Sequence, residues 1–468
     1  MPAAGFDVVV VGGGAAGCAL AARLAADRRV LLLEAGPAVV PEALRAVASL
    51  EATTAGHLLN WTHAAQLRTG HAAVVPRGRV LGGSSAINGA VWMHATPADQ
   101  AAWGLDLTDA YASAATDLDT GRGNGPVPVR RPAGPLRHPA TDRFLAAADA
   151  LGLPHEHDKN AGGPPGAGLV PSNTRDGRRV DAATAYLPGS GAEVRTDVTV
   201  RRVLLDWGRA TGVELTDGAR IHADVTVLAA GAVGTPHLLL ASGIGPADEL
   251  RAAGTTPRAD LPVGRDVTDH PAVFLPFRAP AHTTDPPPHP HAPAAQAALD
   301  LDSGADPAGD VEVLLFARPF APAGELHLMC LLQHPESRGA ITLPAPAGPP
   351  RIEYRYLRTE YDRRRLRYAL RTAAELLRAG LGERAGLDAA ELATDRATDG
   401  WIAAHLTTAV HLCGGAAIGR VVDAAFRVLG IDGLRVADTS VLPVAPRRGP
   451  AATAVALGER AAELIRSG

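Results

Sequence analysis

The sequence predicts an α/β fold, and three observations support that class. Residues 6–34 alternate strand-like and helix-like patterns around a glycine-rich turn, as a βαβ unit does. Later in the chain, short strand-like segments precede one long helical pattern, at residues 311–320, 325–332, 340–343, 351–357 and 360–380. The chain has 468 residues, a length typical of two or three domains.

The N-terminal segment has the pattern of a nucleotide-binding unit. Residues 6–11 are mostly apolar and β-branched, as in a strand that is buried on both faces. Residues 15–26 favour a helix, and residues 30–33 form a second apolar strand that ends at Glu34. Between the first strand and the helix stand three glycines in the spacing G-x-G-x-x-G, namely Gly12, Gly14 and Gly17.

Each residue of this motif has a separate physical role. Gly12 permits the tight turn, Gly14 lets the backbone approach a pyrophosphate, and Gly17 lets the helix pack closely on the strand. The helix begins at Ala15 and Ala16, where unpaired N–H groups attract phosphate. Glu34 is placed to accept hydrogen bonds from a ribose diol. The segment therefore predicts a bound dinucleotide, and it leaves open whether this is FAD or NAD.

Composition and charge exclude several functional classes. The chain is 46% hydrophobic and 20% charged with a net charge of −4, which indicates a globular protein without a basic surface for nucleic acid. Cys18, Cys330 and Cys413 form no CxxC pair, so we expect neither a disulfide framework nor a metal site. No apolar run reaches the length of about 18 residues that spans a membrane. We expect a cytoplasmic protein, with peripheral contact to the inner membrane left open.

Two further glycine- and serine-rich segments identify a family. They are PRGRVLGGSSAINGAVWMHA at 76–95 and AAGAVGTPHLLLASGIGP at 229–246, and each alone could be an ordinary loop. Together, after the βαβ unit, they resemble the two signatures of the glucose–methanol–choline (GMC) flavoprotein oxidoreductases. Further family landmarks lie at 60–61, 185–188, 262–271, 335–343 and 433–443, so the resemblance spans almost the whole chain.

The resemblance implies the domain organisation and the cofactor. A discontinuous, Rossmann-like FAD-binding domain would comprise residues 1–270 and 409–468. Residues 271–408 would form a substrate-binding domain, with a mostly antiparallel sheet and flanking helices that include the segments between 311 and 380. Some members attach FAD covalently through a histidine before the asparagine of the first signature. Ile87 stands at that position here, so we expect non-covalent FAD.

The βαβ unit and the resemblance together predict the cofactor site. The resemblance places the first signature against the cofactor, Val200 against the adenine, and Asp438 near the ribityl–phosphate part. The full predicted set is Gly12, Gly14, Ala15, Ala16, Gly17, Glu34, Gly82, Gly83, Ser84, Asn88, Val200 and Asp438.

His411 is the predicted catalytic residue. It opens the stretch HLCGGAAIGRVVD, which alone fits a metal ligand, a buried core histidine or a catalytic base. The resemblance implies a base that faces the flavin, preceded by Thr408 as in the family. Oxidation of an alcohol moves a hydride from carbon to flavin N5 while the hydroxyl loses a proton. A histidine with an ordinary pKa of about 6.5 can accept that proton at neutral pH.

The sequence departs from the family pattern just before its last helix, expected at about 451–465. The family places there a second histidine or asparagine that contacts the substrate oxygen, and this position falls on Ala451. Alanine can neither donate nor accept through its side chain. We therefore considered Arg447, Arg448 and His405 as replacements, with Arg448 as a substrate contact, or His411 acting without a partner.

The predicted function is FAD-dependent removal of a hydride from a CH–OH donor. The chain ending RRGPAATAVALGE resembles the mycofactocin-associated GMC subgroup. That resemblance implies reduced mycofactocin (mycofactocinol) as donor and the respiratory chain as electron acceptor. Two alternatives are a GMC alcohol oxidase or dehydrogenase for a small or sugar alcohol, and a hydroxynitrile-lyase-like protein whose flavin is not reduced.

Overall fold

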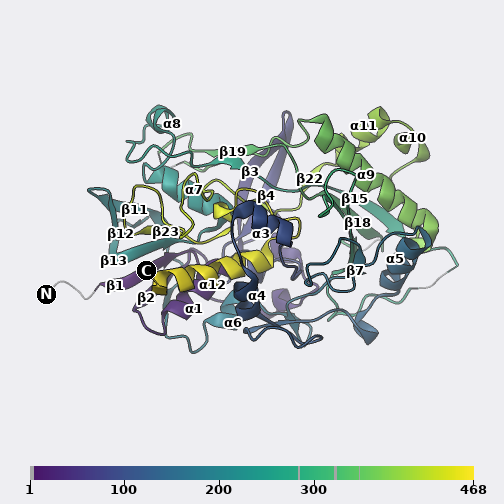
Figure 1. Ribbon diagram of the computed structural model, residues 1–468, viewed down its shortest axis with the longest axis horizontal. Coiled ribbons are helices and arrows are strands. Elements are labelled where there is room, and N and C mark those ends of the chain that lie inside the picture. Colours follow the sequence, from purple (N-terminus) through teal and green to yellow (C-terminus); the bar gives the residue numbers. More distant parts are fainter. Residues whose placement is uncertain (1–4, 283–284, 321–323, 347, 468) are drawn as a thin grey trace.

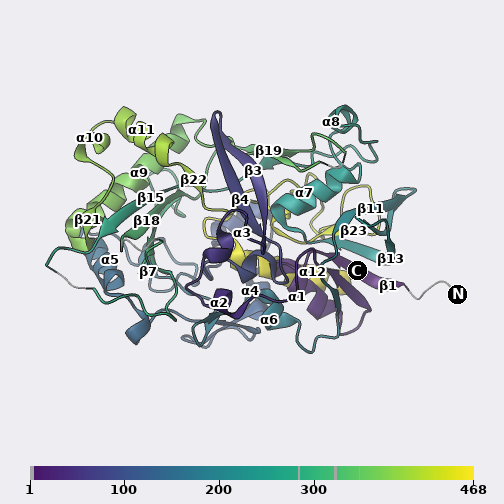
Figure 2. The same ribbon diagram turned by 180° about the vertical axis from the view of Figure 1, so that it is seen from behind.

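The computed structural model describes residues 5–282, 285–320, 324–346 and 348–467, and its elements confirm the predicted α/β class. One half of the molecule holds a Rossmann-like sheet, and the other half holds an antiparallel sheet (Figures 1 and 2). The predicted βαβ unit is present as β1 (Phe6–Val11), α1 (Ala15–Leu24) and β2 (Val30–Leu33). The two strands are almost completely buried, as their apolar runs predict.

The Rossmann-like sheet collects strands from three distant parts of the chain. Its parallel strands follow the order β10, β2, β1, β13 and β23, and β13 also pairs with the antiparallel strands β12 and β11. The additional bounds are β10 Glu193–Arg195, β11 Val200–Asp206, β12 Arg209–Leu215, β13 Arg220–Leu228 and β23 Leu434–Val436. The last helix, α12 (Ala451–Ser467), packs along α1 (Figure 1).

Close backbone contacts explain two glycines in this half of the molecule. A Cβ atom added to Gly17 would lie 1.9 Å from the carbonyl oxygen of Gly12, so only glycine lets α1 pack against the preceding turn. A Cβ added to Gly458 of α12 would lie 2.3 Å from the carbonyl oxygen of Ala16. The second contact seats α12 directly on the first turn of α1.

The antiparallel sheet forms the other half of the molecule. Its strands follow the order β21, β15, β18, β17, β16 and β7, with β22 paired to β15. One face packs against α9 (Glu360–Leu376) and α5 (Pro139–Ala150). The strand bounds are β7 Ala167–Leu169, β15 Pro271–Arg278, β16 Ala295–Leu301, β17 Val311–Phe316, β18 Leu326–Leu332, β21 Glu383–Arg384 and β22 Thr407–Thr408.

A separate five-stranded sheet lies between these halves and corrects one expectation. The segments 340–343 and 351–357 were expected in the antiparallel sheet of the substrate domain. Instead they form β19 and β20, and β20 pairs in parallel with β3 through Ile352 and Ala65. The sheet order is β14, β19, β20, β3, β4, with bounds β3 Asn60–Arg68, β4 His71–Gly78, β14 Arg265–Val267, β19 Gly339–Thr342 and β20 Arg351–Glu353.

The domain boundaries at residues 270 and 408 stay a prediction. Two elements from the range 1–270, β7 and α5, lie on the antiparallel sheet. The remaining short strands and helices are β5 Ala115–Asp117, β6 Val127–Val129, β8 Thr174–Arg175, β9 Arg178–Arg179, α2 Glu42–Arg45, α3 Pro97–Trp103, α4 Thr108–Ala114, α6 Ala182–Tyr186, α7 Gly231–Ala241, α8 Ala247–Ala252, α10 Ala389–Leu392 and α11 Asp395–His405.

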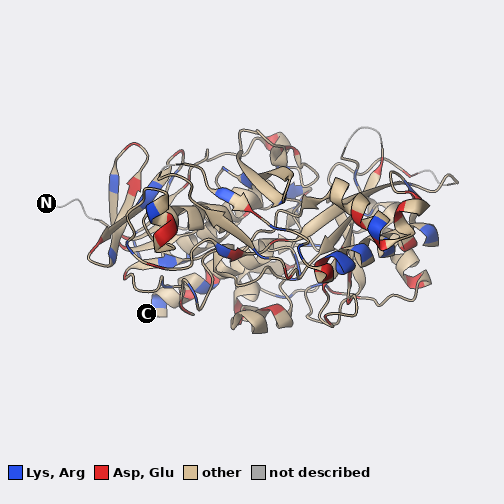
Figure 3. Cartoon of the chain, turned by 90° about the horizontal axis from the view of Figure 1, so that it is seen from above, with Lys and Arg blue, Asp and Glu red and all other residues tan. Residues whose placement is uncertain are grey.

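Charged residues of both signs occur in both halves of the molecule (Figure 3). Within the described ranges, no helix combines the length and hydropathy needed to cross a bilayer. In the same ranges, no three His, Cys, Asp or Glu side chains are grouped as they would be around a metal ion.

Replacement of Gly17 by alanine should destabilise the protein. The added methyl group would collide with the backbone of Gly12, and such overpacking costs about 1–3 kcal/mol or more. Gly400 in α11 is the matched control, because a Cβ there meets no atom within 4 Å. Thermal unfolding should show a lower Tm for Gly17→Ala and an equal or higher Tm for Gly400→Ala. Equal Tm values for Gly17→Ala and the unmodified protein would contradict the packing argument.

Candidate active site

The glycine-rich turn leaves room for a ligand at one position only. A Cβ on Gly12 would lie 2.5 Å from the carbonyl oxygen of Ala229, whereas a Cβ on Gly14 would meet no atom closer than 4.0 Å. Gly14 is also the N-cap of α1, and no side chain caps that helix end. The first turn of α1, at Ala15 and Ala16, thus starts without a side-chain cap beside a glycine with room around it, which fits a pyrophosphate.

Glu34 lies beside this turn at the end of β2. Its carboxylate accepts hydrogen bonds from the N–H groups of Gly13 (2.9 Å) and Gly36 (2.8 Å). Burial raises the pKa of Glu34, although these two hydrogen bonds act in the opposite direction. The backbone N–H of Val198 donates to the carbonyl of Glu34, so Val200, two residues later, starts β11 close to the same edge. The predicted ribose and adenine positions are thus neighbours.

The first signature folds against the glycine-rich turn. Gly82 and Gly83 both have positive φ angles, of 97° and 53°, and a 3₁₀ turn follows over Gly83–Ala86. The N–H of Gly82 donates to the carbonyl of Gly13 at 2.7 Å, and a Cβ on Gly83 would lie 2.7 Å from the Cα of Gly14. Ser84 is exposed beside this contact.

Two other predicted cofactor residues hold turns in place. The side-chain oxygen of Asn88 accepts from the N–H of Ala90 at 2.9 Å. The buried carboxylate of Asp438 accepts from the N–H of Gly231 (2.8 Å) and the hydroxyl of Thr235 (2.5 Å) at the start of α7, which is the second signature. Burial raises the pKa of Asp438 despite these bonds. Direct contact of either residue with the cofactor stays a prediction.

His411 is paired with a second histidine. Its Nδ1 lies 2.9 Å from the Nδ1 of His270, and the two rings meet edge to face with their centres 5.1 Å apart. The Nε2 of His411 lies on the far side, beside Gly449, where an added Cβ would be 3.4 Å away. His270 belongs to the landmark segment at 262–271, but sequence reasoning did not single it out. Only the fold brings it to His411.

One buried carboxylate positions both histidines. Asp269 Oδ1 accepts hydrogen bonds from the backbone N–H groups of His270 (2.7 Å) and His411 (2.8 Å). Its Oδ2 accepts from the hydroxyl of Thr408 at 2.7 Å. Asp269 is 2% exposed, and burial raises its pKa. Three hydrogen bonds to one carboxylate thus join the segment before β15 to the end of β22 and the residues after it.

The surroundings keep the imidazole of His411 neutral. Burial and, second, the positive charge of Arg77 lower the pKa of His411 to about 3. Arg77 on β4 donates to the carbonyl of Val410 at 2.6 Å, next to His411. Burial and the neighbouring His411 hold the pKa of His270 well below its usual value. Both histidines are therefore neutral at pH 7.

All three candidate replacements for the missing polar group are engaged with residues other than His411. Arg447 pairs with Asp99 and Asp306, and Arg448 pairs with Glu156 and Asp300. His405 stacks on Trp401 in α11 with ring centres 4.1 Å apart.

Ala451 is the first residue of α12, as the sequence predicted. The side chain of Arg448 is only 2% exposed and its terminal nitrogens are engaged in ion pairs, so the structure describes an ion-pairing residue. Its contact with substrate stays a prediction.

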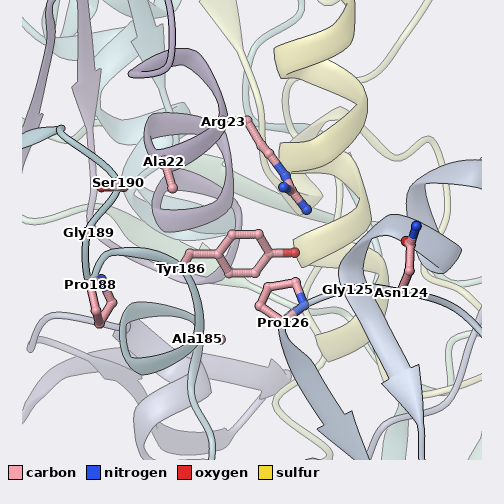
Figure 4. A pocket seen from close by; sticks show the side chains of 10 residues that line it. All are labelled: Ala22, Arg23, Asn124, Gly125, Pro126, Ala185, Tyr186, Pro188, Gly189 and Ser190. Atoms are coloured by element: carbon pink, nitrogen blue, oxygen red, sulfur yellow. The ribbon is translucent and has the colours of Figure 1, made fainter.

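A surface groove of about 380 Å³ lies away from the histidine pair (Figure 4). Tyr186 and Arg23 line it, and both bind Glu459 of α12, Tyr186 through a hydrogen bond of 2.6 Å. Because these polar groups already have protein partners, we assign no ligand to this groove.

The geometry defines a class of protein: a dinucleotide-binding enzyme with a histidine pair at the junction of its two halves. Comparison with known proteins then identifies the family. The model of the GMC oxidoreductase family matches residues 6–272, and a second model of the same family matches residues 335–458. The chain belongs to the GMC oxidoreductase family.

Individual relatives are similar over almost their whole length. An uncharacterized GMC-type oxidoreductase of Rhodococcus erythropolis is 36% identical over 98% of each chain. An oxygen-dependent choline dehydrogenase of Sinorhizobium fredii is 29% identical, over 98% of this chain and 95% of the relative. The crystal structure of pyridoxine 4-oxidase from Mesorbium loti superposes with a TM-score of 0.88, 30% identity and 99% coverage of both chains.

Family membership confirms the predicted cofactor, FAD, and the predicted class, an oxidoreductase acting on CH–OH groups. The residues present fit this cofactor, since the open space at Gly14 and the uncapped start of α1 suit its pyrophosphate. The non-covalent mode of binding stays a prediction, supported by the apolar side chain of Ile87.

Removal of the Asp269 carboxylate should impair the site without removing FAD. Asp269→Ala loses three hydrogen bonds that position both histidines, and a displacement of about 1 Å can reduce a rate about 10²-fold. Asp269→Asn keeps an amide oxygen for the backbone N–H groups and should retain more activity. Bound FAD per protein and the rate of anaerobic flavin reduction by an alcohol donor measure both effects. An unchanged rate in Asp269→Ala would show that the carboxylate does not position the histidines.

Proposed function

We propose that this chain oxidises the CH–OH group of its donor to a carbonyl, with His411 as the base. The observation that supports this proposal is the neutral histidine pair held by Asp269. FAD, when bound, supplies the acceptor for the hydride. The C–H and O–H bonds of the donor break, the C=O bond forms, and His411 takes the hydroxyl proton.

The histidine pair determines which nitrogen of His411 accepts that proton. Two Nδ1 atoms at 2.9 Å require one N–H and one lone pair between them. The Nε2 of His270 has no hydrogen-bond partner among the described residues, and the backbone of Pro446 and Gln333 acts to raise the pKa of this ring. We propose that His270 carries its proton on Nε2, toward these backbone groups. Accordingly, His411 donates through Nδ1 to His270, and its Nε2 keeps a lone pair. That nitrogen is the proposed base.

Within this function, we propose reduced mycofactocin as the donor and the respiratory chain as the acceptor. The support is the sequence resemblance of RRGPAATAVALGE at 447–459 to the mycofactocin-associated subgroup. A cytoplasmic location, with contact to the inner membrane left open, belongs to the same proposal. Anaerobic flavin reduction should be compared among mycofactocinol, choline, glucose and benzyl alcohol. Fast reduction by one of the last three, without reduction by mycofactocinol, would refute this donor.

Oxygen consumption tests the alternative of an alcohol oxidase, which the names of two relatives motivate. An oxidase produces hydrogen peroxide at the rate of donor turnover, whereas the proposed dehydrogenase reoxidises slowly in air. A hydroxynitrile-lyase-like activity would instead give product without any bleaching of the flavin. The three functions thus give different combinations of flavin bleaching and peroxide.

Loss of the His411 imidazole should slow flavin reduction about 10²–10⁴-fold, the usual contribution of a positioned general base. His411→Ala should retain FAD, because the glycine-rich turn is formed by other segments. His405→Ala is the matched control, since His405 contacts Trp401 rather than the site. Stopped-flow absorbance under anaerobic conditions measures the rate. The proposal fails if His411→Ala reduces its flavin as fast as the control.

The rate of flavin reduction should depend little on pH between pH 8 and pH 5.5. A histidine with an ordinary pKa of about 6.5 would lose about nine-tenths of its neutral form at pH 5.5. His411, with a pKa of about 3, stays neutral throughout this range. Arg77→Gln removes the nearby positive charge, raises the pKa of His411 and should move the acid limb of the rate profile to higher pH. A tenfold fall in rate from pH 7.5 to pH 5.5 in the unmodified enzyme would contradict this expectation.

A further inference from the structure

The antiparallel sheet has a second, apolar face that is not covered by α9 and α5. The strand register places Phe274, Met329 and Leu314 side by side on this face, because Met329 pairs with both of the others. The side chains of Val91 and Ala409 pack against the same cluster. Val91 lies within the first signature segment (76–95), and Ala409 precedes His411 by two residues. The apolar face is therefore continuous with the candidate active site.

Four aromatic side chains cluster on this face. Phe274, Phe316 and Phe320 meet edge to face, with ring centres between 5.0 and 5.9 Å apart, and His327 stacks on Phe320 at 4.5 Å. These are three of only seven phenylalanines in a chain that is 4% aromatic, so their grouping is not a consequence of composition. We call Phe274, Phe316, Phe320 and His327 the aromatic wall.

The aromatic wall is not part of a closed core. Phe320 is 46% exposed, and Phe274 and Phe316 are only partly buried. The opposite face of the same strands is fully packed, with Phe277 and Leu328 at 0% exposure. Leaving aromatic rings in water forgoes the favourable burial of a large apolar surface. A ligand that covers the aromatic wall would bury this apolar surface. Through Ala409, the wall adjoins the segment that carries His411.

The position of the wall defines the length of such a ligand. Side chains two residues apart point to the same face of a strand, so Ala272 and Phe274 share one face of β15, and His270 immediately precedes this strand. His270 and Phe274 are separated by about 13 Å, at roughly 3.3 Å per residue. A donor whose hydroxyl lies at His411 therefore reaches the wall only with a body longer than one ring.

The charges around this face favour a neutral donor. Burial lowers the pKa of His327, so its ring is uncharged at pH 7. The carboxylate of Asp300, also on this face, is buried and pairs with Lys159 and Arg448. Burial raises the pKa of the neighbouring Glu312 to about 7. Of these two carboxylates, Asp300 is already paired with two cations and Glu312 is only partly ionised at pH 7, so neither offers a full negative charge to a cationic donor.

We propose that the donor is a neutral, extended aromatic alcohol whose ring lies against the aromatic wall while its CH–OH group lies at His411. This inference rests on the proposed removal of a hydride with His411 as the base, and it does not depend on the proposal of mycofactocinol as the donor. Phe320 is the specificity-determining residue, since it is the most exposed member of the wall.

Alcohols that differ in length and charge test the proposal. In anaerobic flavin reduction, 4-phenylbenzyl alcohol should show a higher kcat/KM than benzyl alcohol, and choline and glycerol should be poor donors. Phe320→Ala should lower kcat/KM for 4-phenylbenzyl alcohol about 3- to 10-fold, the effect of one lost aromatic contact, and leave benzyl alcohol almost unchanged. Tyr368→Ala is the control, because Tyr368 is 37% exposed on α9, behind the sheet.

Binding of a compound that cannot be oxidised gives a second readout. Calorimetric titration with biphenyl-4-carboxamide should give a Kd that is about 3- to 10-fold weaker in Phe320→Ala than in Tyr368→Ala. Equal kcat/KM values for the short and long alcohols, or equal Kd values in the two variants, would overturn the substrate class. If no alcohol reduces the flavin, the proposed function itself fails. Preference for choline over aromatic alcohols would leave the function in place and refute only this inference.

Discussion

The three hydrogen bonds accepted by the Asp269 carboxylate are the constraint on which the rest of the site depends. They join two chain segments that are 142 residues apart, and they set the backbone of both histidines from one point. A buried carboxylate is unfavourable unless donors surround it, and here two backbone N–H groups and one hydroxyl do so. The same low polarity that raises the pKa of Asp269 lowers that of His411 and keeps it unprotonated. The buried surroundings of Asp269 therefore account both for the fixed position of the two histidines and for the unprotonated state of His411.

The cofactor side of the site is constrained by backbone contacts rather than by side chains. Gly12 meets Ala229, Gly83 meets Gly14, and Gly458 meets Ala16, each too closely for a Cβ atom. These contacts bring both family signatures and the last helix to one point. Because glycine has no Cβ, the chain can present N–H groups there and still pack densely. Glycines of the sequence pattern that identifies the family thus stand where backbone segments pack closely around the predicted cofactor site.

Local features of this fold were predictable from sequence, and non-local ones were not. The strands of the βαβ unit have the predicted bounds, since a buried strand, a glycine motif and a helix are encoded within 34 consecutive residues. The segments 340–343 and 351–357 were correctly predicted as strands but assigned to the wrong sheet, because alternation does not reveal which strand is the partner. His270 was overlooked for the same reason, since it lies 141 residues from His411. Arg448 was considered as a substrate contact, and only the structure shows that Glu156 and Asp300 hold it in the interior.

The pairing of β23 with β13 has a consequence for biosynthesis. β13 is synthesised roughly 200 residues before β23, the strand that covers part of its edge. At about 5–20 residues per second, this difference corresponds to about 10–40 s. During that interval the nascent Rossmann half exposes an open sheet edge, and α1 has not yet met α12. Newly made chains therefore lack the complete Rossmann half until residues 434–467 have been synthesised, and chaperones that shield exposed strand edges should associate with the polysome-bound form more than with the folded protein.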